Sequence, residues 1–371
     1  MRILHVLAER GFSGGENQLL ATIRHLQERG HDQVLVLNSG AMFRDSVRDL
    51  GLPCHEVRFR SNYDPIAALG LRKYYRSLAP DLIHLACSRS HKIGSVAGVF
   101  ARSLPPRVVT RRMDYPIRNT WFHRWAYRSA VDAVVAISKG VQEAILKIGV
   151  DPSTVHLINE GVDTGRFGVL REPERRRTAR QRLQLGDDDV LGVTIASLHA
   201  RKAHDVLLEA LAAVQIPAGK RLVWLFGGDG PEREKLIGQA NQLPDQFEVR
   251  IPGQIDYVPD ALAAADLFCL PSRYEGLGVA LLEAVSTGVP CIASRVGGMR
   301  EVLESGISGL HVEVADVGGL TESIQKLIDD PELARRLGAA GMQRAQDRFD
   351  VSLMSRKTEA LFQVLVDSRN G

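Results

Sequence analysis

Two carboxylates eight positions apart, Glu275 and Glu283, stand in the stretch of this sequence whose residue types could do the most chemistry. Residues 270–290 read LPSRYEGLGVALLEAVSTGVP. On one continuous helix of 3.6 residues per turn, this spacing would leave the two side chains far from eclipsed. A joint role therefore requires that Glu275 lie in a loop and that Glu283 lie on a helix.

The residues around the pair supply the necessary break. The apolar run Leu267–Leu270 predicts a buried strand, Pro271 and Ser272 end it, and we expect a helix over Val279–Ser286. For Glu283 the alternative is a solvated position on an amphipathic helix. Its apolar neighbours on both sides make that alternative less favourable.

The start of this predicted helix could bind an anion. The backbone N–H groups of Gly276, Leu277 and Gly278 would point out of the helix start, where the helix dipole also favours negative charge. The sequence therefore predicts that this loop holds the oxygens of a diphosphate.

The Glu-x7-Glu stretch resembles the signature of the retaining glycosyltransferases of family 4, which have the GT-B fold: two Rossmann-like, doubly wound α/β domains facing each other across a cleft. The resemblance implies that Glu275 contacts hydroxyls of a donor sugar and that Glu283 accepts hydrogen bonds from the ribose of the nucleotide. It implies transfer from a nucleotide sugar with retention at the anomeric carbon.

A second stretch, SLHARKAHD at residues 197–205, resembles the Gly-Arg-Leu-x-x-x-Lys-Gly loop of the same family. Lys202 stands at the lysine, Ser197 where arginine is usual, and Ala203 where glycine is usual. A lysine just before a helix can neutralise a diphosphate. The resemblance makes Lys202 and Glu275 the catalytic candidates and adds Ser197 to the donor site. Gly228, in the tight turn after the next predicted strand, faces the same side and is a further donor-site candidate.

Gly14 and Gly15 follow the predicted first strand and, with Glu16, resemble the Gly-Gly-x-Glu loop of the family, where glycine lets the backbone approach a phosphate or the acceptor. The competing interpretation is a dinucleotide-binding turn. The segment GFSGGEN lacks the three-glycine spacing of that turn, and no acidic residue follows the second strand. We therefore disfavour a nicotinamide dehydrogenase.

A basic segment follows the predicted strand that ends near Thr110. Many family members carry a histidine there that touches the donor sugar, whereas this sequence has Arg111, Arg112, Met113 and Asp114. We name as acceptor-binding candidates Arg111, Arg112, Asp114 and Arg118; a plain surface charge is the alternative for each arginine. Residues 1–165 carry 22 Lys and Arg against 15 Asp and Glu. This excess predicts an anionic glycan or glycolipid acceptor.

The length of 371 residues and the alternation of strand and helix patterns predict two domains, each with a parallel sheet covered by helices. We expect an acceptor-side domain at residues 1–165, a nucleotide-sugar domain at 166–351, and a last segment, 352–371, that crosses back onto the first domain. We interpret the charged run at residues 171–182 as a solvated linker and helix start.

Composition restricts the partners and the location of the protein. The four cysteines, Cys54, Cys87, Cys269 and Cys291, sit in apolar runs without metal-type spacing, which indicates buried thiols and no disulfide. No run is long and apolar enough for a membrane helix, and the first apolar run is too short for a signal peptide. We expect a protein of the cytoplasm that can make peripheral contact with the inner face of the membrane, and no nucleic-acid partner.

The expected activity is metal-independent hexosyl transfer, without a cofactor, in bacterial cell-envelope polysaccharide or lipopolysaccharide synthesis. The triplet Asp187, Asp188 and Asp189 precedes a strand and indicates a polar loop, not a metal site. With Glu283 assigned to ribose, no pair of carboxylates is left for a retaining glycosidase. Two rivals stay open: a nucleotide-sugar epimerase of the same fold, and a non-catalytic protein that binds sugar nucleotides.

Overall fold

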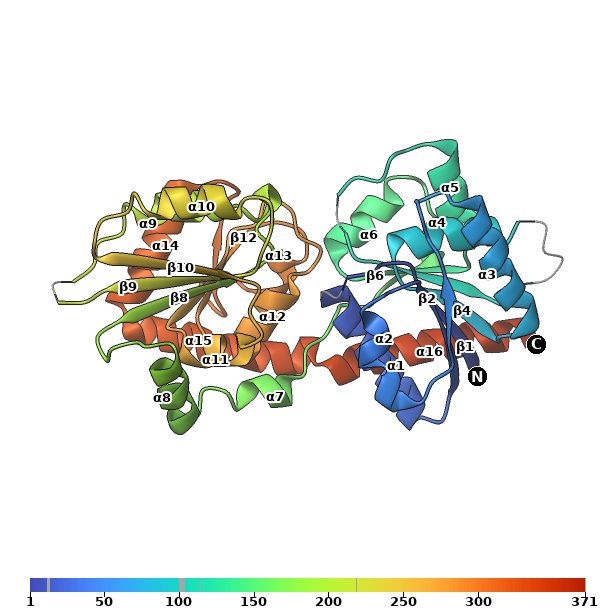
Figure 1. Cartoon of the computed structure of the whole chain (residues 1–371), viewed down its shortest axis with the longest axis horizontal. Coiled ribbons are helices and arrows are strands. Elements are labelled where there is room, and N and C mark those ends of the chain that lie inside the picture. The colour runs from blue at the N-terminus through green and yellow to red at the C-terminus, as the bar shows by residue number, and fades with distance from the viewer. Residues whose placement is uncertain (12–13, 100–103, 114, 218, 371) are drawn as a thin grey trace. The chain divides into compact units, whose positions relative to one another are not determined.

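A computed structural model of the protein describes residues 1–11, 14–99, 104–113, 115–217 and 219–370. The chain forms two compact units (Figure 1). The first unit consists of Met1–Gly161 and Val351–Gly371, and the second consists of Val162–Asp350.

The first unit is built on a parallel sheet in which the described residues form seven strands, in the order β3-β2-β1-β4-β5-β6-β7. Its strands are β1 (Arg2–Leu7), β2 (Asp32–Asn38), β3 (Cys54–Val57), β4 (Leu82–Leu85), β5 (Arg107–Arg111), β6 (Ala133–Ala136) and β7 (Val155–Leu157). Its helices are α1 (Gly14–Glu28), α2 (Phe43–Ser46), α3 (Pro65–Ser77), α4 (Ser88–Ala97), α5 (Trp121–Arg128), α6 (Lys139–Leu146) and α16 (Val351–Asn370), with 3₁₀ turns at Arg48–Leu50 and Pro152–Thr154.

The second unit has a parallel sheet of six strands within the described part of the chain, in the order β10-β9-β8-β11-β12-β13. Its strands are β8 (Val190–Ile195), β9 (Leu222–Gly227), β10 (Phe247–Gly253), β11 (Leu267–Leu270), β12 (Cys291–Ser294) and β13 (Leu310–Val312). Its helices are α7 (Thr164–Gly168), α8 (Pro173–Arg182), α9 (His204–Leu211), α10 (Arg233–Ala240), α11 (Val258–Ala264), α12 (Val279–Ser286), α13 (Met299–Val302), α14 (Val317–Asp329) and α15 (Pro331–Phe349), with a 3₁₀ turn at Ala200–Lys202.

Both sheets reverse their winding direction at one point. In the first unit β1 lies between β2 and β4, and in the second unit β8 lies between β9 and β11. Loops at the carboxyl ends of such neighbouring strands diverge, and ligands bind in the resulting crevice. The predicted fold class, two Rossmann-like doubly wound α/β domains, is confirmed.

The first unit contains a chain of buried polar side chains at its centre. Gln33 donates through Nε2 to the carbonyl oxygen of Ile23 at 3.0 Å, so its Oε1 accepts from His5 Nε2 at 3.0 Å. His5 Nδ1 must then accept the proton of His84 Nδ1, 3.0 Å away, and His84 Nε2 accepts from the Thr110 hydroxyl at 2.9 Å. Both rings are therefore neutral, and burial lowers the pKa of His5 to about 4.

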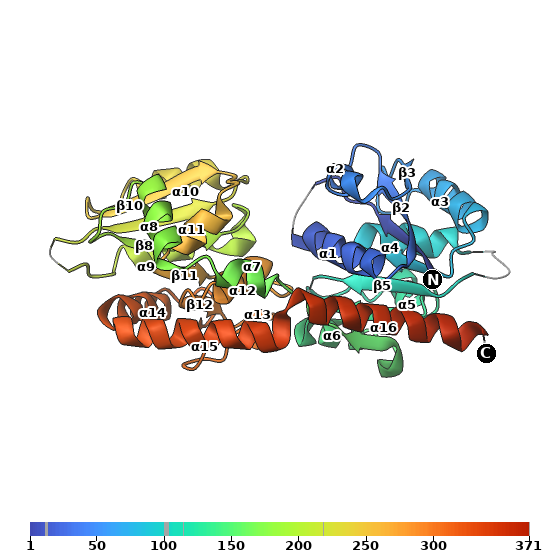
Figure 2. The ribbon, with the colours of Figure 1, turned by 90° about the horizontal axis from the view of Figure 1, so that it is seen from below.

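Helix α16 packs against α1 within the first unit (Figure 2). Glu359 of α16 lies 2.8 Å from His25 Nε2 and 2.9 Å from His31 Nε2. The pKa of this carboxyl is lowered to about 2; burial opposes the shift, and the hydrogen bonds from His31 and His25 outweigh it. These polar contacts, with the buried Phe362, attach the C-terminal helix to the first unit.

The change from first to second unit occurs at Val162, where we expected it at residue 166. Val162 pairs with Asp350 in a parallel bridge and donates its N–H to Phe349 at 2.8 Å. The Thr164 hydroxyl donates to Asp350 Oδ2 at 2.5 Å. The two places where the chain passes between the units therefore lie side by side, which places both boundaries at this bridge.

Two expectations about local environment need correction. The charged run at residues 171–182 is not merely solvated, because Arg176 and Arg180 reach Asp266 at 2.7 and 3.1 Å and also donate to carbonyls at the end of α11. Cys54 and Cys87 are only half-buried, and the Cys87 sulfur accepts from Ser90 N–H at the start of α4. In both cases a tertiary or capping contact decides the environment.

Within the described residues, no helix has the length and apolarity that crossing a bilayer requires.

Candidate functional site

Lys202 and Glu275 form an ion pair in the second unit, through Nζ and Oε2. Lys202 ends the 3₁₀ turn that follows β8, and Glu275 lies in the loop that follows β11. These two strands are neighbours at the point where the sheet reverses direction, so the pair lies where ligands bind in doubly wound sheets. The side chains are only 10% and 14% exposed.

A second ion pair joins the loop after β11 to the first turn of α9, which directly follows Lys202. Arg273 donates from Nη1 and Nη2 to the two carboxylate oxygens of Asp205, at 3.0 Å each. Its backbone N–H also donates to the carbonyl of Arg201 at 2.8 Å. A bidentate pair of this kind restricts both partners, so it holds Lys202 and Glu275 in place from the side.

The loop that carries Lys202 also rests on the glycine turn after β9. Leu198 donates to Asp229 at 2.9 Å, and Ser197 lies beside Gly228, whose backbone has a φ of +153°. A Cβ atom at Gly228 would overlap the carbonyl oxygen of Ala196. Gly228 thus permits the close approach of two loops, which is a supporting role for the site.

We expect Gly228→Ala to lower the free energy of unfolding by about 2 kcal/mol or more, because the added methyl meets backbone and the φ angle is strained for alanine. Gly238→Ala, in α10, is the matched control, since nothing lies within 4 Å of its added Cβ. The control should be neutral or stabilising by up to about 1 kcal/mol. Urea unfolding followed by circular dichroism measures both; equal effects would refute the close-approach role.

The glycine-rich loop lies where the sequence predicted it, directly before α12. Gly278 is the N-cap of the helix with a φ of +89°, and Gly276 accepts from the N–H of Gly298 at 2.8 Å. Leu277 is buried. The first N–H groups of a helix have no partner within it, so the start of α12 presents donors and a positive dipole end next to Glu275.

Glu283 lies on α12 as predicted and is half-buried, not solvated. Burial raises the pKa of its carboxyl to about 7, and the positive charge of Arg166 opposes that shift. Glu283 is therefore partly protonated at neutral pH. Contact with hydroxyl donors would favour its ionised form.

Gly14 and Gly15 begin α1 in the first unit, and Arg112 lies against them. A Cβ atom at Gly15 would stand 3.0 Å from Arg112 Cδ. Arg112 donates from Nε to Glu160 at 2.7 Å and from Nη1 to the carbonyl of Ala86. Glu160 and the Ala86 carbonyl thus hold Arg112, one of the predicted acceptor-binding residues.

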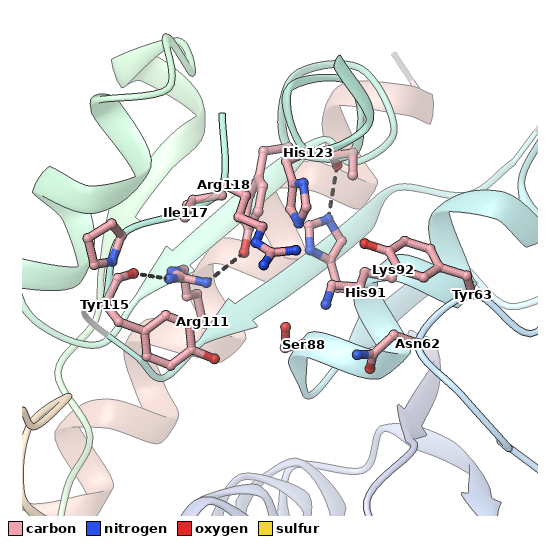
Figure 3. A pocket seen from close by; sticks show the side chains of 13 residues that line it. Asn62, Tyr63, Ser88, His91, Lys92, Arg111, Tyr115, Ile117, Arg118 and His123 are labelled. Atoms are coloured by element: carbon pink, nitrogen blue, oxygen red, sulfur yellow. Dashed lines mark hydrogen bonds between the residues drawn. The ribbon is translucent and has the colours of Figure 1, made fainter. Parts of the chain in front are cut away.

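Arg111 and Arg118 line a pocket of about 360 Å³ in the first unit, near the carboxyl ends of β4 and β5 (Figure 3). Lys92 and His123 share its wall. Arg112 is absent from the described lining, and Asp114 lies outside the described residues. The structure therefore groups two of the four acceptor candidates with two residues that the sequence did not single out.

Lys92 and His123 belong to no recognised motif, and each has the appearance of a surface residue in the sequence. The available signal was topological. Lys92 lies one helical turn into α4, directly after the strand β4 that borders the reversal point, and α5 carries His123 after the basic segment.

Both halves of the chain match known families. Residues 12–166 match the family described as Glycosyltransferase Family 4, and residues 175–344 match Glycosyl transferases group 1. The chain is 26% identical over 355 residues to the lipopolysaccharide core biosynthesis glycosyltransferase LpsE of Rhizobium meliloti, covering 95% of each protein. It is 32% identical over 227 residues to a GDP-mannose-dependent phosphatidylinositol monomannoside mannosyltransferase of Mycolicibacterium smegmatis, covering 59% of this chain and 58% of that protein.

The fold also matches solved structures. The crystal structure of Anabaena HepE in complex with UDP and glucose superposes with a TM-score of 0.82 at 20% identity, covering 98% of this chain and 100% of that one. The lipopolysaccharide outer core galactosyltransferase WaaB superposes with a TM-score of 0.73 at 16% identity, covering 98% and 99%. From the two family matches and this shared fold, the chain belongs to the GT-B glycosyltransferases of group 1 and family 4.

Proposed function

We propose that this enzyme transfers a hexosyl group from a nucleoside diphosphate sugar to a glycan or glycolipid acceptor, with retention at the anomeric carbon and without a metal ion. The observation that carries the proposal is the Lys202–Glu275 pair at the reversal point of the second sheet, beside the start of α12. A cation and a helix start together suit a diphosphate, and a carboxylate suits sugar hydroxyls.

The residues divide the work by the part of the donor that each contacts. Lys202 and the N–H groups at residues 276–278 neutralise the diphosphate as it leaves, which is preorganised electrostatic stabilisation. Glu275 orients the sugar through its hydroxyls, and Glu283 accepts from the ribose. The acceptor oxygen bonds to the anomeric carbon while the bond from that carbon to the phosphate oxygen breaks. The departing phosphate oxygen takes the acceptor proton.

We assign the acceptor to bacterial cell-envelope synthesis, as an anionic glycan or glycolipid. Support comes from the basic pocket of the first unit and from the name of the relative LpsE. Peripheral contact with the cytoplasmic face of the membrane is part of the proposal, because Ile66 and Leu69 of α3 and Trp121 of α5 are 62%, 67% and 72% exposed. Apolar and aromatic side chains of this kind insert between lipid headgroups.

A panel of nucleotide sugars tests the transfer reaction. We expect release of nucleoside diphosphate only when donor and an envelope glycan fraction are both present, and NMR of the product should show the donor's anomeric configuration. An inverted product contradicts retention. Conversion of the donor into its epimer without any acceptor would instead establish the nucleotide-sugar epimerase. Binding of the donor without any reaction would establish the non-catalytic protein that binds sugar nucleotides.

Calorimetry with the bare nucleoside diphosphate tests the division of roles between the carboxylates. Glu275→Gln should leave diphosphate affinity nearly unchanged while impairing turnover, whereas Glu283→Gln should weaken diphosphate binding. Because the Glu283 pKa is about 7 and its ionised form accepts from ribose, affinity should rise about tenfold from pH 6 to pH 8. Glu283→Gln should flatten that rise. Equal weakening by the two variants would contradict the assignment.

A further inference from the structure

The pocket of the first unit concentrates positive charge. Lys92 from α4, Arg111 at the end of β5, Arg118 from the following loop and His123 from α5 all line it (Figure 3). None of the described residues in its wall carries a carboxylate. A protein site that gathers basic groups without balancing acids is suited to an anion.

The basic groups of the pocket act on one another. Burial lowers the pKa of Lys92, and the charges of Arg111, Arg89 and Arg118 lower it further. Burial likewise lowers the pKa of His123, followed by the charges of Lys92, Arg118 and Arg111. This mutual repulsion is unfavourable in the folded protein, and a bound anion would relieve it.

Arg111 is held in a fixed position in the wall. It is 7% exposed, and it donates from Nη1 to the Tyr127 hydroxyl at 3.1 Å and from Nη2 to the Tyr115 carbonyl at 2.8 Å. Its guanidinium also lies 5.4 Å from the centroid of the Tyr115 ring. The buried Nε has no hydrogen-bond partner within the part of the chain that the structure describes. A fixed guanidinium loses little conformational freedom on binding a ligand.

The geometry points to a phosphoryl-binding subsite for the acceptor in this pocket, with Arg118 and Lys92 supplying the movable charges, Arg111 the fixed one, and Ser88 a hydroxyl donor. This inference rests on the proposed function, because it takes the phosphoryl group to be part of the acceptor. A phosphomonoester carries a charge of about −1.5 to −2 and three acceptor oxygens, which suits several cations better than a single carboxylate would. Ser88 also begins α4, whose N-terminal dipole end favours the same anion.

Titration of the full chain with sn-glycerol 3-phosphate tests the subsite. The titration contains saturating UDP, GDP, ADP and dTDP. These nucleoside diphosphates fill the proposed donor site of the second unit, so that sn-glycerol 3-phosphate cannot bind there. We expect millimolar binding by the unaltered protein and at least a tenfold loss in the double variant Arg118→Gln, Lys92→Gln. Both side chains lie in the pocket wall and are incompletely buried, so the substitutions keep the core intact. Arg124→Gln, an exposed arginine of α5 outside the described pocket wall, is the matched control and should bind as the unaltered protein does.

Three results would overturn the inference. The first is no binding of sn-glycerol 3-phosphate to the unaltered protein, and the second is equal binding by the double variant and the Arg124→Gln control. The third is preference for glucuronate over sn-glycerol 3-phosphate with the same dependence on Arg118 and Lys92, which would make the subsite one for carboxylates. Binding needs no turnover, so the result is independent of the transfer assay and separates a failure of this inference from a failure of the proposed function.

Discussion

Replacing Lys202 with alanine is expected to lower kcat by about 10²- to 10³-fold, the effect of losing one preorganised electrostatic group worth roughly 3 to 4 kcal/mol in the transition state. Negative charge grows on the diphosphate as the bond to the sugar breaks, so the ammonium group stabilises the transition state more than the bound donor. The KM for the donor should therefore change much less than kcat.

Lys202 pairs with Glu275 at a site where both side chains are largely buried, so removal of the lysine also leaves a carboxylate without its partner. Lys202→Gln, which keeps a hydrogen-bond donor, should lose kcat almost as severely while folding normally. Arg201→Ala, the neighbouring cation, is the control.

Kinetics with the donor identified by the nucleotide-sugar panel decides the role of Lys202, and circular dichroism reports on the fold. Lys202 does not stabilise the charge on the leaving group if kcat falls less than about tenfold in both lysine variants. The same conclusion follows if Arg201→Ala lowers kcat as much as the lysine variants do. Loss confined to the donor KM would assign it to ground-state binding instead.

The second large effect expected is loss of stability in mild acid, greater in the first unit than in the second. Burial lowers the pKa of His5 and His91 to about 4 and that of His84 well below its ordinary value of 6.5. These three belong to the first unit. Protonation of His5 would also place its new Nδ1–H against the Nδ1–H of His84 across their 3.0 Å contact.

The direction in which stability changes with pH follows from the linkage between proton binding and folding. The unfolded chain takes up protons near pH 6.5 and the folded unit does not, so the stabilisation is complete above pH 6.5 and falls as the pH drops toward 4. At pH 5 a histidine whose pKa falls from 6.5 to about 4, as those of His5 and His91 do, lowers the free energy of unfolding by about 2 kcal/mol. In the second unit burial lowers the pKa of His204 to about 4, but the raised pKa of Glu283 gives the opposite dependence between pH 7 and its unfolded value of 4.5.

Hydrogen exchange, corrected for the intrinsic rate at each pH, can follow the two sheets separately. We expect the strands of the first unit to lose protection at a higher pH than those of the second. His91→Gln, whose amide can still donate to the Ala126 carbonyl, should lower the pH of that loss in the first unit. His199→Gln, an exposed control, should change nothing. Simultaneous loss in both units, or stability that is flat from pH 7 to pH 5, would contradict the linkage argument.

Local signals in the sequence were enough for much of the second unit. The apolar run, the glycines and the following apolar helix pattern predicted β11 at Leu267–Leu270 and α12 at Val279–Ser286, and both have these bounds in the structure. The placement of Glu275 in a loop and Glu283 on a helix followed from the same pattern. The periodicity of apolar residues and the conformational preferences of turn residues act over a few positions. Both can therefore be recognised in the sequence without knowledge of the tertiary structure. The short strand β13 was not anticipated, because its three residues are too few to show a period.

Contacts between distant residues depended on the tertiary structure. Lys202 meets Glu275 only because β8 and β11 are neighbours in the sheet, and Arg112 meets Glu160 only because the loops after β5 and β7 converge. The sequence by itself determined the alternating elements, the two doubly wound domains and the residues that suit a nucleotide sugar. The tertiary structure alone decided which charges are neutralised by a partner and which line the pocket, because strand order, not local propensity, determines which loops share an edge of the sheet.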